Sequence, residues 1–228
     1  MSASIKTIAK NWMPSLVGFI YRAGLNEVSK RRYRDRPKRF LEIGPGPKRI
    51  EGFESLNVVW WPNVDYVADA STKLPFPDNT FDLVYGSHVL EHIPWYKTES
   101  VLAEWRRILK PGGRLEIWVP NGLEICRAFV MAEEQKPNDI EKDGWYRFNE
   151  ERDPAKWAAG RIFSYGDGRG TPGHHNWHLA LFSERYLIEV FERVGFADCG
   201  RLSAEEVRGY DHGWINMGIG GTKSNAVS

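Results

Sequence analysis

The stretch Phe40-Leu41-Glu42-Ile43-Gly44-Pro45-Gly46 joins an apolar run to an acid and two glycines. Lys38 to Ile43 predicts a buried parallel strand, followed by a tight turn at its carboxyl end. Glycine lets the backbone approach a ligand closely, and ligands of open parallel sheets bind outside the carboxyl ends of the strands. The carboxylate of Glu42 would repel a pyrophosphate but suits a cation, such as an amino group or a sulfonium. A tight turn without a ligand is the alternative.

Length and composition predict one α/β domain with additions at its edge. The chain has 228 residues, with 31 basic and 30 acidic side chains, so its overall charge does not indicate a polyanion-binding protein. Cys126 and Cys199 are far apart and lack metal-site spacing, which predicts neither a disulfide framework nor a zinc site. We find no signal-peptide pattern and no apolar run of the roughly 20 residues that span a bilayer. A soluble, cytoplasmic protein is expected.

Residues 1–36 are expected to precede a main domain of residues 37–228. Apolar residues at helical spacing predict an amphipathic helix in this first segment: Ile5, Ile8, Trp12, Leu16 and Ile20. A basic run follows at Lys30, Arg31, Arg32, Arg34, Arg36, Lys38 and Arg39. We interpret this run as a solvated face and expect no nucleic-acid partner. Peripheral contact of the helix and the run with an anionic membrane surface is the alternative.

Short apolar runs predict four more strands and a helix before residue 121. The expected strands are Leu56–Trp60, Asp65–Ala70, Phe81–Tyr85 and Leu115–Val119. Helical periodicity between Thr98 and Lys110 predicts a helix that Pro111-Gly112-Gly113 ends. The alternation of strands and crossovers predicts a parallel, doubly wound α/β sheet.

Five motifs occur in an order that resembles the class I S-adenosylmethionine-dependent methyltransferases, in particular their type 11-like members. The motifs are Leu41–Gly46, Asp69-Ala70, Leu74–Asp82, Ser87–Ile93 and Leu109–Gly113. The resemblance implies a Rossmann-like, doubly wound sheet of seven strands that is mostly parallel with an antiparallel last strand. It also implies S-adenosylmethionine as cofactor, bound across the carboxyl ends of the first strands.

The resemblance also assigns donor-binding roles to residues of these motifs. Glu42, Gly44, Pro45 and Gly46 match the motif whose glycines approach the methionine part of the donor and whose acid orders its ammonium group. Asp69 matches the acid that accepts a hydrogen bond from the adenine amino group, with the amide of Ala70 beside it. The family usually has an acid after the second strand, where we align Val59 instead. Asn57 is the nearby polar substitute for that acid.

The residues after the fourth strand are expected to lie where the donor and acceptor pockets meet. We place Ser87 beside the donor. His88 is our candidate general base, because the pKa of an imidazole lies near neutrality. A capping or backbone-bonding role for His88 is the alternative. Glu91 and His92 are expected to shape the floor of the pocket.

Residues 122–181 are predicted to form an insertion that covers the acceptor side of the sheet as a lid. It contains a helix from Leu123 to Glu134, many aromatic residues and a glycine-rich loop. We expect its polar and aromatic side chains to bind the acceptor, namely Trp145, Tyr165, His174, His175 and His178. Packing against the sheet is the alternative for the tryptophans. The histidine spacing matches no metal site that we recognise, so we expect no metal.

The last part of the chain predicts a helix capped by Ser183 and two closing strands, Ala197–Leu202 and Trp214–Ile219. Gly218, Gly220 and Gly221 are expected at a turn or bulge of the sheet edge.

The sequence as a whole predicts a methyltransferase that acts on a small-molecule acceptor. We expect an O-methyltransferase, with a hydroxyl of a sugar or glycan precursor as the favoured acceptor. Methylation of RNA or protein is one alternative, supported by the basic run. A binding module that kept the fold but lost catalysis is the other, supported by Val59. The sequence gives no expectation about the oligomeric state.

Overall fold

A sheet of seven strands runs through the centre of the molecule, in a computed structural model that describes residues 16–144 and 147–224. The strands are β1 (Phe40–Ile43), β2 (Glu54–Asn57), β3 (Tyr66–Val67), β4 (Phe81–Ser87), β5 (Leu109–Pro120), β6 (Phe196–Leu202) and β7 (Asn216–Lys223). Their order is β3-β2-β1-β4-β5-β7-β6, and β7 is antiparallel to both of its neighbours. The predicted fold class, a mostly parallel seven-stranded sheet with an antiparallel last strand, is confirmed.

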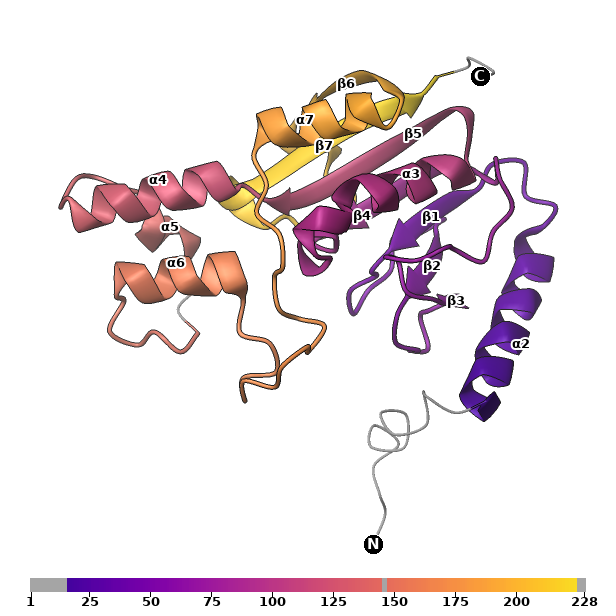
Figure 1. Cartoon of the computed structure of the whole chain (residues 1–228), viewed down its shortest axis with the longest axis horizontal. Helices are drawn as coiled ribbons and strands as arrows, with labels where there is room; N and C mark the ends of the chain where they lie inside the picture. The colour runs from indigo at the N-terminus through magenta and orange to yellow at the C-terminus, as the bar shows by residue number, and fades with distance from the viewer. Residues whose placement is uncertain (1–15, 145–146, 225–228) are drawn as a thin grey trace, which may run out of the picture.

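Two helices cover one face of this sheet, α3 (Thr98–Ile108) and α7 (Glu184–Arg193), which lie side by side in Figure 1. Their apolar stripes enter the main core, where Trp105 of α3 and Phe191 of α7 are fully buried. The short 3₁₀ turns η1 (Leu90–His92) and η2 (Trp95–Lys97) lead from β4 into α3. The other face carries a smaller cluster around Tyr85 and Trp118, to which the loop residue Phe53 contributes.

The second strand ends earlier than the sequence predicts. β2 pairs with β1 in parallel, with Ile43 opposite Leu56, and the amide of Gly44 donates to the Leu56 carbonyl at 2.8 Å. β1 turns away at Gly44, and β2 ends at Asn57, which still pairs with Val67 of β3. The residue at the end of the strand is therefore Asn57, and the alignment of Val59 with that position was wrong.

The glycines of β7 lie inside the sheet, so their predicted place at its edge was wrong. The register of the neighbouring β6 shifts between Ala197 and Gly200, opposite Gly221, which agrees with the predicted bulge. β7 runs between β5 and β6, and these glycines make room for neighbouring side chains. A Cβ at Gly218 would lie 2.7 Å from the ring of Trp118, and one at Gly221 would lie 2.9 Å from the ring of Phe191. Large side chains on the adjacent elements therefore require glycine in this strand.

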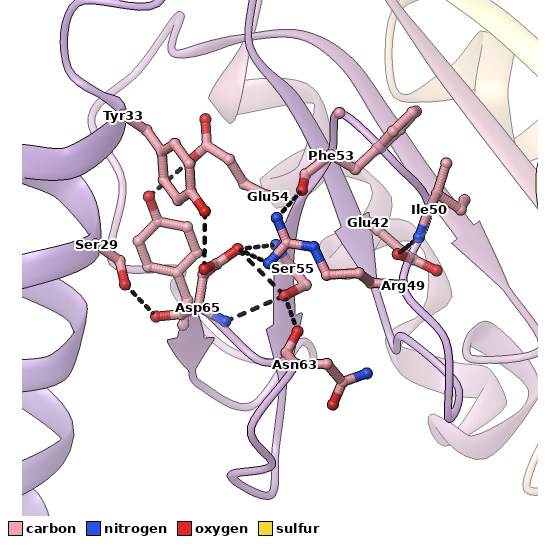
Figure 2. Close-up of polar contacts among 12 residues, drawn as sticks. Ser29, Tyr33, Glu42, Arg49, Ile50, Phe53, Glu54, Ser55, Asn63 and Asp65 are labelled. Carbon is pink, nitrogen blue, oxygen red and sulfur yellow. Dashed lines mark hydrogen bonds and ion pairs between the residues drawn. The ribbon is translucent and has the colours of Figure 1, made fainter.

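The first helix, α2 (Leu16–Tyr33), covers the free edge of the sheet at β3. The side chain of Asn26 takes the place of a neighbouring strand, because it accepts from the amide of Val67 at 2.8 Å and donates to the carbonyl of Val67 at 3.2 Å. Asp65 adds a second connection between α2 and the sheet, which Figure 2 shows. Its carboxylate accepts from the Tyr33 hydroxyl at 2.9 Å and pairs with Arg49 at 3.0 Å.

The predicted first segment is therefore joined to the sheet over its described part. Ile5, Ile8 and Trp12 lie outside the described residues. Most of the basic run is exposed, but Arg39 pairs with the fully buried Glu54 through two contacts of 2.8 Å. Among the described helices, none combines the length and apolar character that a membrane span needs.

The insertion begins with α4 (Gly122–Glu133) directly after β5 and continues through α5 (Ile140–Asp143) and α6 (Pro154–Phe163). These three helices form a group beyond the end of β5 (Figure 1). They have a small core of their own, in which Trp157 is fully buried and stacks on Trp214 at 6.0 Å between ring centroids. Asp143 accepts from the indole of Trp157 at 2.8 Å. Trp157 therefore has a packing role, but within the core of the insertion and not against the sheet as the alternative for the tryptophans held.

Replacing Asn26 by Ala is expected to lower the free energy of unfolding by about 2 to 3 kcal/mol, because both main-chain groups of the buried Val67 lose their partner. The control is Glu27→Ala on the exposed side of the same helix, which should change the stability by less than about 0.5 kcal/mol. Urea unfolding followed by circular dichroism measures both. Equal stability of the two variants would contradict the role of Asn26 at the sheet edge.

Candidate functional site

The turn after β1 and the segment after β4 meet at the centre of the sheet. Ile43 lies opposite Gly86 in the parallel pairing of β1 with β4, so both chains leave the sheet at the same level. Gly44 has a φ of +72°, and a Cβ at this position would lie 2.2 Å from Cγ2 of Val89. Glycine is therefore required here for the backbone conformation and for the contact between the two segments.

A cleft of about 370 Å³ opens at this point, within the usual range of small-molecule sites. It lies at the carboxyl ends of the first strands, where a parallel sheet presents its ligand site. The lining includes eight residues that the sequence selects: Gly44, Pro45, Asn57, Asp69, Ala70, His88, His92 and His175. Residues far apart in the sequence are thus brought into one cavity.

Three of the residues predicted to bind the methyl donor do not line this cleft. The Glu42 carboxylate accepts from the amide of Ile50 at 2.8 Å, as Figure 2 shows, and burial raises the pKa of Glu42 against the effect of this bond. The carbonyl of Gly46 accepts from the side chain of Asn63 at 2.9 Å. Ser87 lies at the end of β4, opposite Trp118 of β5. Glu42 and Gly46 therefore hold the loop after β1, and donor roles for all three remain predictions.

A second, polar pocket of about 250 Å³ adjoins the cleft. His88, His92 and Asn176 line both cavities. The lining of the polar pocket adds Glu91, Pro120, Gly160, Arg161, Ser164, Tyr165, His178, His212 and Ile215. Its walls therefore come from the segment after β4, from α6 and the loop after it, and from the segment before β7.

His88 lies between the two cavities with a φ of +52°, a backbone conformation that is uncommon for a residue with a side chain. Its Nε2 is 3.2 Å from Oδ1 of Asn216, and the Nδ2 of Asn216 donates to Asp211 at 3.1 Å. This orientation makes Nε2 of His88 the donor, so Nδ1 is the atom that can take up a proton. Nδ1 lies 3.0 Å from Glu91.

Glu91 is the most deeply buried acid of this pocket, with 1% of its surface exposed. Burial acts to raise the pKa of Glu91, but the neighbouring His88 and then His92 more than offset it, and the pKa lies below its usual value. Burial together with the charge of His88 lowers the pKa of His212 to about 4. At neutral pH the pocket therefore contains a carboxylate and a neutral imidazole at His212.

The remaining residues that the sequence predicts to bind the acceptor molecule border different cavities or none. Tyr165 and His178 border the polar pocket, and His175 borders the cleft. His174 lines neither of these cavities and packs against His175 at 4.2 Å between ring centroids. Trp145 lies outside the described residues.

Comparison with known proteins relates part of the chain to a family. Residues 30–117 match the family model of the methyltransferase domain. This part of the chain is similar to that domain. The chain's relatives include a sterol 4-C-methyltransferase of Caenorhabditis elegans, 26% identical over 159 residues that make up 70% of this chain and 42% of the relative. A ubiquinone/menaquinone biosynthesis C-methyltransferase of Escherichia fergusonii is 47% identical over 53 residues, which are 23% of this chain and 20% of that protein.

Among solved structures, a methyltransferase of Thermotoga maritima described as a possible histamine N-methyltransferase aligns with a TM-score of 0.47 and 20% identity, over 96% of each chain. The aligned regions cover less than half the length of both curated relatives above. The family match also ends at residue 117, before the insertion begins. The family match therefore concerns the part of the chain that precedes the insertion.

The cleft fits the family's donor, S-adenosylmethionine. The required glycine at residue 44 leaves the main chain of the turn accessible at its floor, and Asn57 and Asp69 bring hydrogen-bonding side chains to its wall. One oxygen of Asp69 accepts from the amide of Ser71 at 2.8 Å, which fixes the side chain while the second oxygen remains for a ligand. A neutral amide at Asn57 takes the place where the family usually has an acid.

Sequence patterns did not indicate several residues of this candidate site. His212 and Asn216 come from the segment before and the start of β7, and no motif marks them. Glu91 was noticed as part of the pocket floor, but its burial among histidines was not. The only pattern in the sequence that could have indicated this cluster is that Glu91 and His92 are adjacent. The cluster is completed by His178, which the loop after α6 places beside them.

Substituting Gly44 by Ala is expected to lower the free energy of unfolding by about 2 kcal/mol or more, because the added methyl group would clash with Val89 and the positive φ disfavours it. Gly46→Ala is the matched control in the same turn, since a Cβ there meets no atom within 4 Å. Chemical unfolding of both variants provides the measurement. A loss at Gly46 as large as that at Gly44 would contradict the proposed packing.

Proposed function

We propose that this protein transfers a methyl group from S-adenosylmethionine to a hydroxyl of a small-molecule acceptor. The observation that carries the proposal is the junction of the two cavities at His88, His92 and Asn176. A donor in the cleft and an acceptor in the polar pocket would meet there. Methyl transfer between bound molecules needs such an alignment above all.

The donor supplies an activated methyl group on a sulfonium, and S-adenosylhomocysteine is left when the methyl carbon bonds to the acceptor oxygen. Asn57, Asp69 and Ala70 are proposed to hold its adenosine part, and the main chain at Gly44 its methionine part. The acceptor must lose its hydroxyl proton. Nδ1 of His88 is proposed to take this proton, because Nε2 is fixed as a donor and Glu91 stabilises the resulting imidazolium.

The acceptor side combines polar and apolar surface. His178 belongs both to the polar pocket and to an adjoining groove of about 560 Å³ that contains Trp95, Phe163, Leu181 and Tyr186. An acceptor with a hydroxyl in the pocket and a ring against this groove would use both surfaces. A sugar or glycan precursor, whose apolar faces stack on aromatic rings, is the acceptor class that we favour.

Carbon methylation is the second candidate, because both curated relatives above are named as C-methyltransferases. The family match covers residues 30–117, whereas the polar pocket draws most of its walls from later residues. The relatives therefore support the donor more strongly than the acceptor atom. Transfer of a ¹³C-labelled methyl group, followed by nuclear magnetic resonance of the product, separates an oxygen-bound from a carbon-bound methyl.

Replacing Asp69 by Ala should weaken binding of S-adenosylmethionine at least about 10-fold, since a hydrogen bond to a charged group contributes roughly 1.5 to 3 kcal/mol. Calorimetric titration with S-adenosylmethionine and S-adenosylhomocysteine measures the effect without an acceptor. Glu51→Ala, which removes an exposed acid outside the cleft, is the control and should bind as the wild type does. Failure of the wild type to bind either ligand at millimolar concentration would favour a non-catalytic binding module.

Replacing His88 by Asn should lower kcat about 100-fold or more, the contribution expected of a general base. Asn is chosen because it tolerates the positive φ of this position. The affinity for S-adenosylmethionine should stay within about 3-fold of the wild type, which would show that the cleft is intact. Turnover is measured with the first acceptor found among hydroxylated sugars and related ring compounds, and unchanged turnover would remove His88 from the mechanism.

A further inference from the structure

Three side chains in the polar pocket have the composition and the spacing of a metal site. Glu91, His92 and His178 each offer one ligand atom, and these atoms lie within 4.8 Å of one another. Glu91 and His92 belong to η1, whereas His178 comes from the loop after α6. The rings of His92 and His178 meet edge to face, with 4.8 Å between their centroids. The fold thus gathers two imidazoles and a carboxylate from distant parts of the chain.

Hydrogen bonds to main-chain carbonyls fix both imidazoles in the form that binds a metal. Nδ1 of His92 lies 3.2 Å from the carbonyl oxygen of Trp177, and Nδ1 of His178 lies 3.2 Å from that of Arg161. A carbonyl oxygen only accepts, so Nδ1 is the donor in both rings and Nε2 keeps its lone pair in the neutral form. Metal-binding histidines typically donate their other ring nitrogen in this manner.

The carboxylate of Glu91 supplies an independent observation. Its side chain is 1% exposed, and among residues 16–144 and 147–224 no group donates an aligned hydrogen bond to either of its oxygens. His88 approaches at 3.0 Å, but without the alignment of a hydrogen bond. Removing a carboxylate from water is unfavourable when no hydrogen-bond donors replace the water. A cation held between Glu91 and the two imidazoles would offset this cost.

The position of Glu91 is itself fixed by the insertion. Its carbonyl accepts from the amides of Leu179 and Ala180 at 2.7 and 3.1 Å. The same loop carries His178, so these bonds hold the second imidazole beside Glu91 and His92. The three side chains therefore lie together because main-chain hydrogen bonds join the loop after α6 to η1.

We propose that Glu91, His92 and His178 bind a divalent transition cation, with Zn²⁺ as the ion that fits them best. Two imidazoles and a carboxylate are a known ligand set for zinc, whereas Mg²⁺ prefers oxygen ligands. Bonds of about 2.1 Å to a tetrahedral ion place ligand atoms roughly 3.4 Å apart, so small side-chain rotations bring the three atoms into place.

Three protein ligands leave a coordination position open, as in catalytic zinc sites. All three residues border the polar pocket, so this position is accessible to a molecule bound there. If the proposed function holds, the cation would help to bind and orient the hydroxyl of the acceptor. This consequence rests on the proposed function, whereas binding of the cation does not.

The test is titration of the full chain, stripped with a chelator, with Zn²⁺ by calorimetry and with Co²⁺ by visible absorption. We expect one cation per chain and the absorption of a tetrahedral or five-coordinate Co²⁺ complex. His92→Ala, His178→Ala and Glu91→Gln should each weaken Zn²⁺ binding by about 100-fold or more, because each removes a direct ligand. Mg²⁺ should bind far more weakly than Zn²⁺.

His174→Ala is the matched control, because it removes a histidine of the same loop that is not part of the cluster. It should bind Zn²⁺ as the wild type does. Circular dichroism and thermal unfolding of each stripped variant verify the fold, and Zn²⁺ should raise the unfolding temperature of the wild type but not that of Glu91→Gln. Absence of stoichiometric binding to the wild type, or binding that Glu91→Gln and His178→Ala leave unchanged, would overturn the proposal.

Calorimetry with S-adenosylmethionine on the same preparation separates the two hypotheses. Donor binding without Zn²⁺ binding would overturn the metal site and leave the proposed function standing. Zn²⁺ binding without donor binding would support the metal site and count against the proposed function.

Discussion

The contact between Gly44 and Val89 is the constraint on which the site depends. It joins the turn after β1 to the segment after β4, and it is available because residue 44 has no side chain. The register of β1 against β4 brings both segments to the same level of the sheet. One wall of the donor cleft and the start of η1 are positioned by this contact. A methyl group at residue 44 would therefore disturb both the cleft and the polar pocket.

The most deeply buried acids of this protein differ in their partners. Glu54 and Glu116 lie inside the molecule, and each is paired with an arginine, Arg39 and Arg208, through short contacts. Such pairing compensates for the loss of solvent. Glu91 is equally buried but faces imidazoles instead of a guanidinium. A buried carboxylate that faces imidazoles is typical of a functional site, because such a contact stabilises the fold less than a pair with an arginine does.

The insertion of residues 122–181 contributes to both cavities at the carboxyl ends of the strands. Its helices pack around Trp157 in a core of their own, and its returning loop is bonded to the carbonyl of Glu91. Through that loop His175 reaches the donor cleft and His178 reaches the polar pocket. Much of the wall of the polar pocket therefore comes from a part of the chain that the family match does not cover.

The sequence by itself determined the fold class and much of the donor cleft, because Gly44, Asp69 and the residues around His88 belong to local motifs with fixed places on a parallel sheet. It misplaced the end of β2 and the glycines of β7, since strand ends and close packing depend on neighbouring strands. Tertiary structure alone decided the placement of His178 beside Glu91. Such a cluster forms through the return of a loop from 87 residues further along the chain, and no local pattern encodes that contact.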